Sequence, residues 1–249
     1  KKPERAFWQV NRTKRLGEAK KRLKWTTSYS AGLVWFDESE AQRASARVFQ
    51  VPMDASGRRE RPMVPDPDGK DEKVRFLVAF GAGCRFFHAL PVRRPVKRNA
   101  DGTAVRQPRR APHPNNAKLN APNQGTTWTT ERLIQIVKPW LSKLRKARGV
   151  VLDNAPAHKS LAIQLKAQRV KVVTDHPPYS PDMNLAEDVI RDLKQDAKVG
   201  GLPKDNEELR KRLCDAAKKY DMKRLTKHVA TYKERMQEVV HRKGLPTQF

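Results

Sequence analysis

The sequence predicts an α/β fold, a mixed sheet flanked by helices, with C-terminal helices and expanded basic loops. Strand-like segments come first and alternate with helical segments later, an order typical of mixed α/β layers. The chain has 249 residues, enough for one large domain with a substantial core. Hydrophobic residues make up 37% of it, so the composition is that of a globular protein rather than a disordered one.

The net charge is the most unusual feature of the composition. Lys and Arg number 53 against 27 Asp and Glu, which gives a formal net charge of +26. The basic residues are spread over several segments rather than along one amphipathic helix, so nucleic acid is a better partner than a membrane surface. No apolar run approaches the ~20 residues that cross a bilayer. Two cysteines exclude a disulfide framework and a Cys-rich zinc module.

The first half of the chain predicts a helix followed by three strands. Residues 1–25 are strongly basic with weak helical spacing, as expected of a linker helix. An apolar run at 33–36, closed by Asp37, is typical of a buried strand that ends in an acid. Two further apolar segments, 74–80 and 85–90, flank a glycine-rich turn and predict a hairpin.

Two Pro- and Arg-rich segments divide this pattern. Residues 51–72 and 91–125 predict loop insertions in a catalytic-type core that spans 26–200. Residues 201–249 predict a C-terminal helical extension.

The second half begins with a helix and another strand that ends in an acid. Apolar residues recur with helical spacing over 129–144, and Pro139 is expected to kink or divide that helix. The run at 149–152 then predicts a strand that ends at Asp153, with a short helix following at 158–168.

A turn and several helices complete the pattern. We expect a strand at 170–174, a proline-rich turn at 176–181 and a helix over 185–198. Apolar faces over 209–220 and 225–240 predict two more helices.

Three acids have positions suited to metal binding. Asp37 and Asp153 follow buried strands, at the sheet edge where α/β proteins bind ligands, and Glu187 lies in the helix after the proline-rich turn. Three converging carboxylates suit Mg²⁺ or Mn²⁺, and two such ions ~4 Å apart promote phosphodiester chemistry. The spacing alone leaves a simpler alternative open, in which two acids belong to turns and the third favours a helix N-terminus.

Three motifs around these acids occur in a fixed order. They are Trp35–Ser39 (WFDES), Leu152–His158 (LDNAPAH) and Pro177–Glu187 (PPYSPDMNLAE). In this order they closely resemble the mariner superfamily of DDE/D transposases, and the resemblance extends over residues 8–249. It implies an RNase H-like catalytic domain that lacks the family's N-terminal helix-turn-helix modules.

The resemblance also implies a chemistry and a set of residues. Asp37, Asp153 and Glu187 correspond to the catalytic, metal-binding triad, with Mg²⁺ or Mn²⁺ as the cofactor. DNA strand cleavage by water and strand transfer by a 3′ hydroxyl follow as the implied activity, with a homodimer as the implied assembly. Four further motif residues are expected to support the site, with the last two fixing the turn that aims Glu187: Asn154, His158, Asp182 and Asn184.

The residues expected to contact nucleic acid share a position in the two most basic regions. They are Arg12, Lys14, Arg15, Lys20, Lys21, Arg22, Arg93, Arg94, Lys97, Arg98, Arg106, Arg109 and Arg110. Cations in such regions bind the phosphate backbone with little sequence preference.

Two functions fit these residues, and the sequence leaves open whether the chain is an active enzyme. The first is a DNA transposase or nuclease domain, which would act in the nucleus. The second is an exapted, non-catalytic protein that binds RNA within a large ribonucleoprotein such as an organellar ribosome, in a mitochondrion or another such compartment. The absent recognition modules and the +26 charge favour the second, while the three retained acids favour the first.

Overall fold

The computed structural model describes residues 2–42, 73–92 and 128–249, with side chains from residue 9 onward. The predicted insertion at 51–72 and nearly all of that at 91–125 lie outside these ranges. So do seven of the residues expected to bind nucleic acid, namely Arg93, Arg94, Lys97, Arg98, Arg106, Arg109 and Arg110. No helix within the described ranges is both long and apolar enough to span a bilayer.

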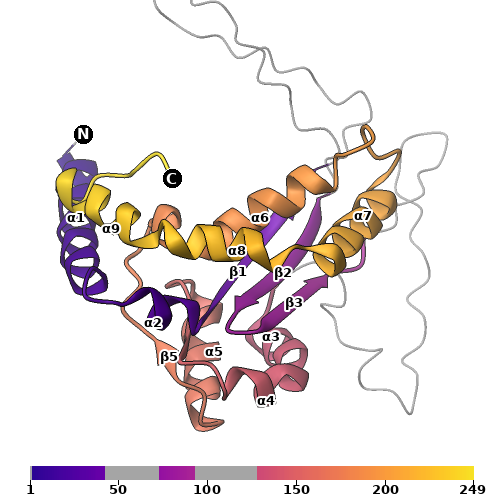
Figure 1. Ribbon diagram of the computed structural model, residues 1–249, viewed down its shortest axis with the longest axis horizontal. Coiled ribbons are helices and arrows are strands. Elements are labelled where there is room, and N and C mark those ends of the chain that lie inside the picture. Colours follow the sequence, from indigo (N-terminus) through magenta and orange to yellow (C-terminus); the bar gives the residue numbers. More distant parts are fainter. Residues whose placement is uncertain (1, 43–72, 93–127) are drawn as a thin grey trace, which may run out of the picture.

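A five-stranded mixed sheet forms the centre of the domain (Figure 1). Its strands are β1 (Leu33–Ala41), β2 (Val74–Gly81), β3 (Cys84–Ala89), β4 (Gly149–Val151) and β5 (Val172–Val173), in the order β3-β2-β1-β4-β5. β2 runs antiparallel to its neighbours β1 and β3, whereas β4 and β5 run parallel to β1. The predicted mixed α/β sheet is therefore confirmed.

The predicted hairpin is β2–β3, joined by a two-residue turn. Ala82 and Gly83 both have positive φ, at 44° and 73°, as the turn that best matches strand twist requires. Gly81, at φ 133°, precedes the turn, and a Cβ there would lie 2.1 Å from the carbonyl oxygen of Leu33. Only glycine fits at this position, so the approach of β2 to β1 depends on it.

Helices cover both faces of the sheet. They are α1 (Lys2–Arg22), α2 (Thr27–Ala31), α3 (Thr130–Val137), α4 (Leu141–Leu144), α5 (Pro156–Ala167), α6 (Leu185–Asp196), α7 (Asn206–Lys219), α8 (Met222–Ala230) and α9 (Tyr232–His241), with 3₁₀ turns η1 (Lys138–Trp140) and η2 (Pro181–Met183). Side chains alternate along β1, so Trp35 packs with α6 to α9 while Val34 and Phe36 pack with α3 to α5. The sheet is thereby buried on both sides.

Three elements differ from the sequence prediction or refine it. Pro139 divides the helix over 129–144 into α3, η1 and α4, as expected from its missing N–H. The predicted helix over 225–240 is two helices, because the backbone turns at Thr231, whose hydroxyl donates to the carbonyl oxygen of His228. The first predicted strand does not end at Asp37, because β1 continues to Ala41 through its pairing with β2.

The two ends of the chain lie side by side, where α1 packs against α9 (Figure 1). Arg12 donates from Nε to the carbonyl oxygen of Lys243 at 2.6 Å, and Arg15 donates from Nε to that of Gly244 at 2.9 Å. A Cβ on Gly244 would lie 2.2 Å from the carbonyl oxygen of Arg12, so the close approach requires glycine. The basic N-terminal helix is thus part of the folded unit.

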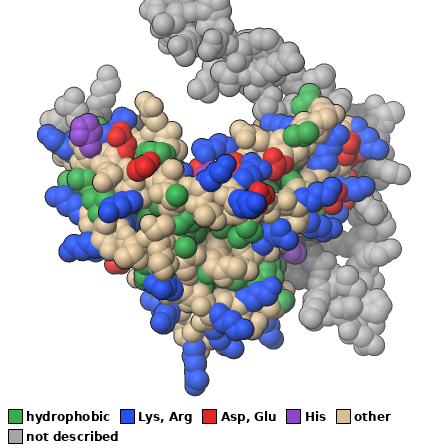
Figure 2. All heavy atoms as spheres, in the orientation of Figure 1, with side chains coloured by type: hydrophobic (Ala, Val, Ile, Leu, Met, Phe, Trp, Pro, Cys, Tyr) green, Lys and Arg blue, Asp and Glu red, His purple; other side chains and the backbone are tan. Residues whose placement is uncertain are grey.

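The visible surface is rich in Lys and Arg side chains, with acidic side chains interspersed mainly over the upper part of the view (Figure 2). This distribution agrees with the net charge of +26.

Candidate active site

The register of the parallel strands places Asp37 beside Asp153. Trp35 of β1 pairs with Val151 of β4, and each acid lies two residues further along its strand. The parallel pairing ends before the acids, so both side chains lie at the edge where β1 and β4 separate. This is the edge at which α/β sheets bind ligands.

Glu187 joins this edge from the first turn of α6. The helix begins after Asn184, whose side-chain oxygen accepts from the N–H of Ala186 at 3.1 Å and so caps the helix. The other end of the same amide donates from Nδ2 to Oδ2 of Asp37 at 2.9 Å. One buried side chain therefore connects the helix that carries the third acid to the strand that carries the first.

The three acids repel one another. Burial is the main cause that raises the pKa of Asp37, and the negative charges of Glu187 and Asp153 add to it. Together they bring this pKa to about 7. Burial also raises the pKa of Glu187, with the charges of Asp188 and Asp153 adding to the effect and that of Lys194 opposing it. These effects show that all three carboxylates lie within electrostatic reach of one another.

His158 lies at the start of α5 and bridges two acids. Its Nδ1 contacts Oδ1 of Asp153, and its Nε2 lies 3.2 Å from Oε1 of Glu38. Burial opposes the charged imidazolium, but the two carboxylates outweigh burial and raise the pKa of His158 to about 10. The imidazolium in turn holds the pKa of Asp153 below its ordinary value, against the opposing effect of burial. His158 is therefore a cation at neutral pH.

Glu38 is the residue of this group that the motif analysis did not single out. Successive side chains of a strand point to opposite faces, so Glu38 faces α5 while Asp37 faces α6. Side chains alternate between the two faces of the strand after Asp37, and this alternation could have identified Glu38 from the sequence as a partner for His158.

The motif residues Asn154 and Asp182 hold the proline-rich turn from two sides. Asn154 donates from Nδ2 to the carbonyl oxygen of His176, the residue before the turn. Asp182 in η2 receives both arms of the Arg15 guanidinium, at 2.8 and 2.7 Å. The backbone and hydroxyl of Thr247 also donate to Asp182, each at 2.9 Å. The turn that leads to Glu187 is thus held by both ends of the chain.

Two of the residues expected to bind nucleic acid are instead structural. Arg15 and Arg22 are each 1% exposed. Arg15 pairs with Asp182, while Arg22 pairs with Glu18 at 2.9 Å and donates to the hydroxyl of Tyr232 at 2.9 Å. The structure corrects the expectation for these two, because helical spacing places them on the face of α1 that packs inward.

The other four cations expected on α1 differ in exposure. Lys14, Lys20 and Lys21 are exposed, and the ion pairs of Lys21 with Glu18 and Asp175 are loose, at 3.5 and 3.8 Å. Arg12 is half-buried and donates to a backbone carbonyl. Contact of these four with nucleic acid stays a prediction.

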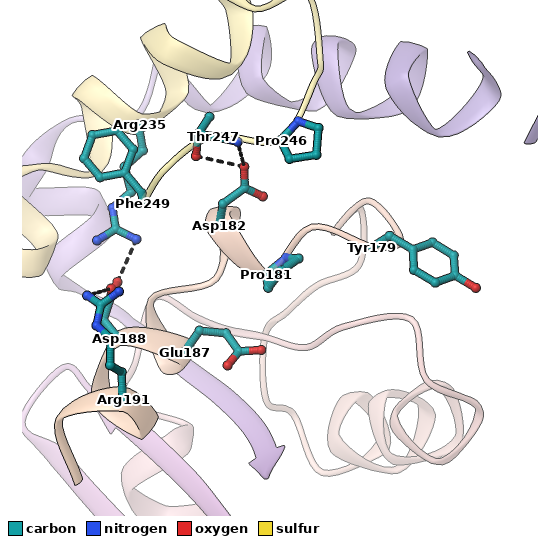
Figure 3. Close-up of a pocket in the computed structure, with 10 residues that line it drawn as sticks. All are labelled: Tyr179, Pro181, Asp182, Glu187, Asp188, Arg191, Arg235, Pro246, Thr247 and Phe249. Atoms are coloured by element: carbon teal, nitrogen blue, oxygen red, sulfur yellow. Dashed lines mark hydrogen bonds and ion pairs between the residues drawn. The ribbon is translucent and has the colours of Figure 1, made fainter. Parts of the chain in front are cut away.

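A cavity of about 560 Å³ opens beside Glu187 (Figure 3). Its wall is formed by the proline-rich turn with η2, the start of α6, and the segment after α9. Asp188 and Arg235 form a buried ion pair at 2.7 Å on one side, while the side chain of Glu187 points into the open space between that pair and Tyr179 (Figure 3). The acid is therefore accessible to a ligand of nucleotide size.

The donor chemistry of this edge suits a hard divalent cation. Among the residues that the structure describes, no three Asp, Glu, His or Cys side chains converge into a metal-binding group. Burial, followed by repulsion from neighbouring acids, raises the pKa of both Asp37 and Glu187. A cation between oxygen ligands of this kind would relieve that repulsion, so the residues fit Mg²⁺ or Mn²⁺.

We expect the free energy of unfolding of the metal-free Asp37→Asn variant, relative to that of the wild-type protein, to be higher at pH 8 than at pH 5. The pKa of Asp37 rises from 3.8 to about 7 on folding, so a proton favours the folded state. The stability that this group contributes is complete below its unfolded pKa and is lost as the pH rises through the folded pKa, by about 2–3 kcal/mol between pH 5 and 8. Asn is neutral at both values and avoids the loss.

Urea unfolding in EDTA at the two pH values measures this difference. The variant is expected to gain on the wild-type protein as the pH rises. A difference in unfolding free energy that stays constant with pH would contradict the raised pKa of Asp37.

Comparison with known proteins supports a family for the chain. A family model described as DDE superfamily endonuclease matches residues 115–210, the part that contains Asp153 and Glu187. No curated protein matches the sequence significantly.

Solved structures with the same fold are mariner transposases. The catalytic domain of Mos1 transposase with raltegravir and Mg has a TM-score of 0.61 at 16% identity, over 96% of this chain and 98% of that chain. The catalytic domain of Mos1 mariner transposase gives 0.60 at 14% identity, over 96% of each chain. The Mos1 mariner paired-end complex with Mn gives 0.61 at 16% identity, over 94% of this chain and 63% of that chain.

At these identities the structural likeness shows the RNase H-like fold of a transposase catalytic domain. The family match adds the endonuclease superfamily over the two later motifs. Residues 115–210 thus match the DDE superfamily endonuclease model, and the described chain has the fold of the Mos1 transposase catalytic domain.

Proposed function

We propose that this domain cleaves DNA strands by metal-dependent hydrolysis and transfers the resulting 3′ ends. The proposal is supported by the placement of Asp37 and Asp153 where β1 and β4 separate, with Glu187 in the first turn of α6, and by the raised pKa values of Asp37 and Glu187. The family match and the shared fold support the nuclease class.

In this proposal Asp37, Asp153 and Glu187 hold Mg²⁺ or Mn²⁺. When bound, the metal would supply Lewis-acid stabilisation of the phosphate charge and would lower the pKa of water or a 3′ hydroxyl. Structures of the Mos1 catalytic domain with Mg and with Mn support this choice of cation.

The neighbouring residues orient the acids. His158, protonated at neutral pH, holds Oδ1 of Asp153 and leaves the second oxygen of that carboxylate for a ligand. Asn184 fixes Oδ2 of Asp37 from the start of α6. We assign both to positioning roles, because restrained carboxylates lose less entropy when a ligand binds.

The proposed partner is DNA, and a homodimer and a nuclear location belong to the same proposal. A Mos1 structure is a paired-end complex, and the exposed cations of the present chain suit a phosphate backbone. Neither the fold nor the comparisons support the RNA-binding ribonucleoprotein alternative.

Incubation of the purified chain with supercoiled plasmid tests this function. We expect nicked and linear products with Mg²⁺ or Mn²⁺ and none with EDTA, because the three carboxylates act only through a bound cation. Cleavage that persists in EDTA, or none with either metal, would contradict the proposal.

A further inference from the structure

The end of the sheet opposite the acids carries a second concentration of positive charge. Residues 132–152 and 154–174 contain no Asp or Glu. They form the helix, strand and turn segments on both sides of Asp153. The cations of these segments therefore have no acid close to them in sequence.

Six of these cations lie together at the end formed by α4, α5 and the starts of β4 and β5. We call this set the basic pole, and it consists of Lys143, Lys146, Arg148, Lys166, Arg169 and Lys171. All six are exposed. Figure 2 shows Lys and Arg side chains gathered at the corresponding lower end of the molecule, where Figure 1 places α4 and α5.

Hydrogen bonds between three segments make the basic pole a defined surface. Arg145 donates from Nε to the carbonyl oxygen of Gln168 at 2.8 Å, which joins the end of α4 to the end of α5. The backbone N–H of Arg148 donates to the carbonyl oxygen of Gly32 at 2.8 Å, and that of Val150 donates to the carbonyl oxygen of Lys171 at 2.8 Å. The cations therefore extend from a fixed backbone rather than from independent loops.

The charges of the basic pole are not neutralised within the protein. None of its six residues forms an ion pair with a carboxylate in the described ranges, whereas Arg191 of α6 and Arg210 and Arg212 of α7 each do. Their protein contacts are with rings and a hydroxyl, as for Lys143 over Phe86 at 5.4 Å and Arg148 over Tyr29 at 5.9 Å. Uncompensated cations on a fixed surface favour an anionic polymer as partner.

The backbone conformation of Arg169 is a second feature of this surface that involves a positive charge. It ends α5 in the left-handed conformation, with φ 60°, at the position of the helix-ending motif that glycine usually occupies. Arg costs about 1 kcal/mol more than glycine in this conformation. A cation just past a helix C-terminus is favoured by the helix dipole, so the charge of Arg169 offsets part of this cost.

The position of the basic pole distinguishes its ligand from DNA at the acids. Asp153 lies beyond the carboxyl end of β4, and Asp37 lies at the middle of β1, whereas the pole lies at the amino ends of β4 and β5. The twelve residues of α5 separate the two over ~18 Å. The two surfaces are therefore distinct, and the number of duplexes bound per chain distinguishes two separate ligands from one that spans both.

We propose that the basic pole binds the sugar-phosphate backbone of a second duplex DNA segment, apart from the strand held at Asp37, Asp153 and Glu187. This inference rests on the proposed DNA-cleaving function for its choice of DNA. Six backbone cations without a groove-reading element predict binding that ignores base sequence and weakens steeply with salt.

The test compares three forms of the full chain with short duplexes. Lys146→Gln, Lys166→Gln and Lys171→Gln are combined in the pole variant. The matched control combines Lys211→Gln, Lys219→Gln and Lys227→Gln, which removes the same charge from exposed positions on α7 and α8. Native mass spectrometry at low salt counts the duplexes bound per chain.

We expect two duplexes per chain for the wild-type protein and the control, and one for the pole variant. The slope of log affinity against log salt should fall by about 0.9 for each phosphate that the pole variant no longer neutralises. An equal loss in the control would overturn the proposal, because it would show an effect of net charge alone. Unchanged stoichiometry in the pole variant would also overturn it.

Two further measurements separate this inference from the proposed function. Cleavage of a short duplex with Mg²⁺ should stay within about twofold of wild type in the pole variant, since exposed substitutions change little else. If no form of the chain cleaves DNA, the proposed function is wrong. The number of duplexes bound per chain still tests whether the basic pole binds DNA. If an RNA duplex displaces DNA from the second site, the assignment of DNA is overturned.

Discussion

Asp153→Asn is expected to lower the rate of Mg²⁺-dependent DNA cleavage by at least about 10³-fold while leaving the affinity for DNA unchanged. Metal ions supply several kcal/mol of transition-state stabilisation, and each 1.4 kcal/mol corresponds to a factor of about ten. Asn keeps the size of the side chain but removes one anionic oxygen ligand. Single-turnover cleavage and fluorescence anisotropy measure the two quantities.

Asp175→Asn is the matched control for this prediction. Asp175 follows β5 at the same end of the sheet, and its side chain is 68% exposed. The control should cleave at the wild-type rate, because no part of the proposed site involves it. Wild-type cleavage by Asp153→Asn would remove Asp153 from the metal site and with it the assignment of the triad.

Arg15→Ala is expected to lower the free energy of unfolding by about 3–5 kcal/mol, the usual cost of leaving a buried charge without its partner. Arg15 and Asp182 are both buried, and the bidentate pair also connects to the backbone after α9. Urea denaturation measures the loss. Should Arg15→Ala fail to fold, Arg15→Lys tests the same pair, because a single ammonium cannot replace both arms of the guanidinium.

The neighbouring exposed Lys14 supplies the control. Lys14→Ala should change the free energy of unfolding by less than about 0.5 kcal/mol. If Arg15→Ala instead weakened DNA binding without loss of stability, the structural role of Arg15 would be wrong and the role expected from the sequence would be restored.

The sequence predicted the elements best where its pattern was local. The hairpin of β2 and β3 and the division of a helix at Pro139 follow from backbone preferences within a few residues. The length of β1 did not follow, because its last residues are strand through pairing with β2, on the far side of an insertion. A propensity scale contains no information on that partner.

The candidate site shows the same limit. Asp37, Asp153 and Glu187 could be selected from their motifs, and strand order explains why they meet. The inward position of Arg15 and Arg22 could not be read from charge, because α1 is basic on several sides and only the packing of α9 decides which face is buried. Asp182 of η2, which pairs with Arg15, and Tyr232 of α9, which accepts from Arg22, each lie more than 150 residues away.

The contacts of Thr247 and Gly244 connect the segment after α9 to the turn that precedes Glu187. They secure Asp182, directly or through Arg15, and Asp182 precedes Glu187 by less than two helical turns. Fusing a tag to this tail, or trimming it, would therefore loosen the third acid from a distance. The position chosen for the C-terminal end of an expressed domain is therefore expected to affect the proposed activity as well as solubility.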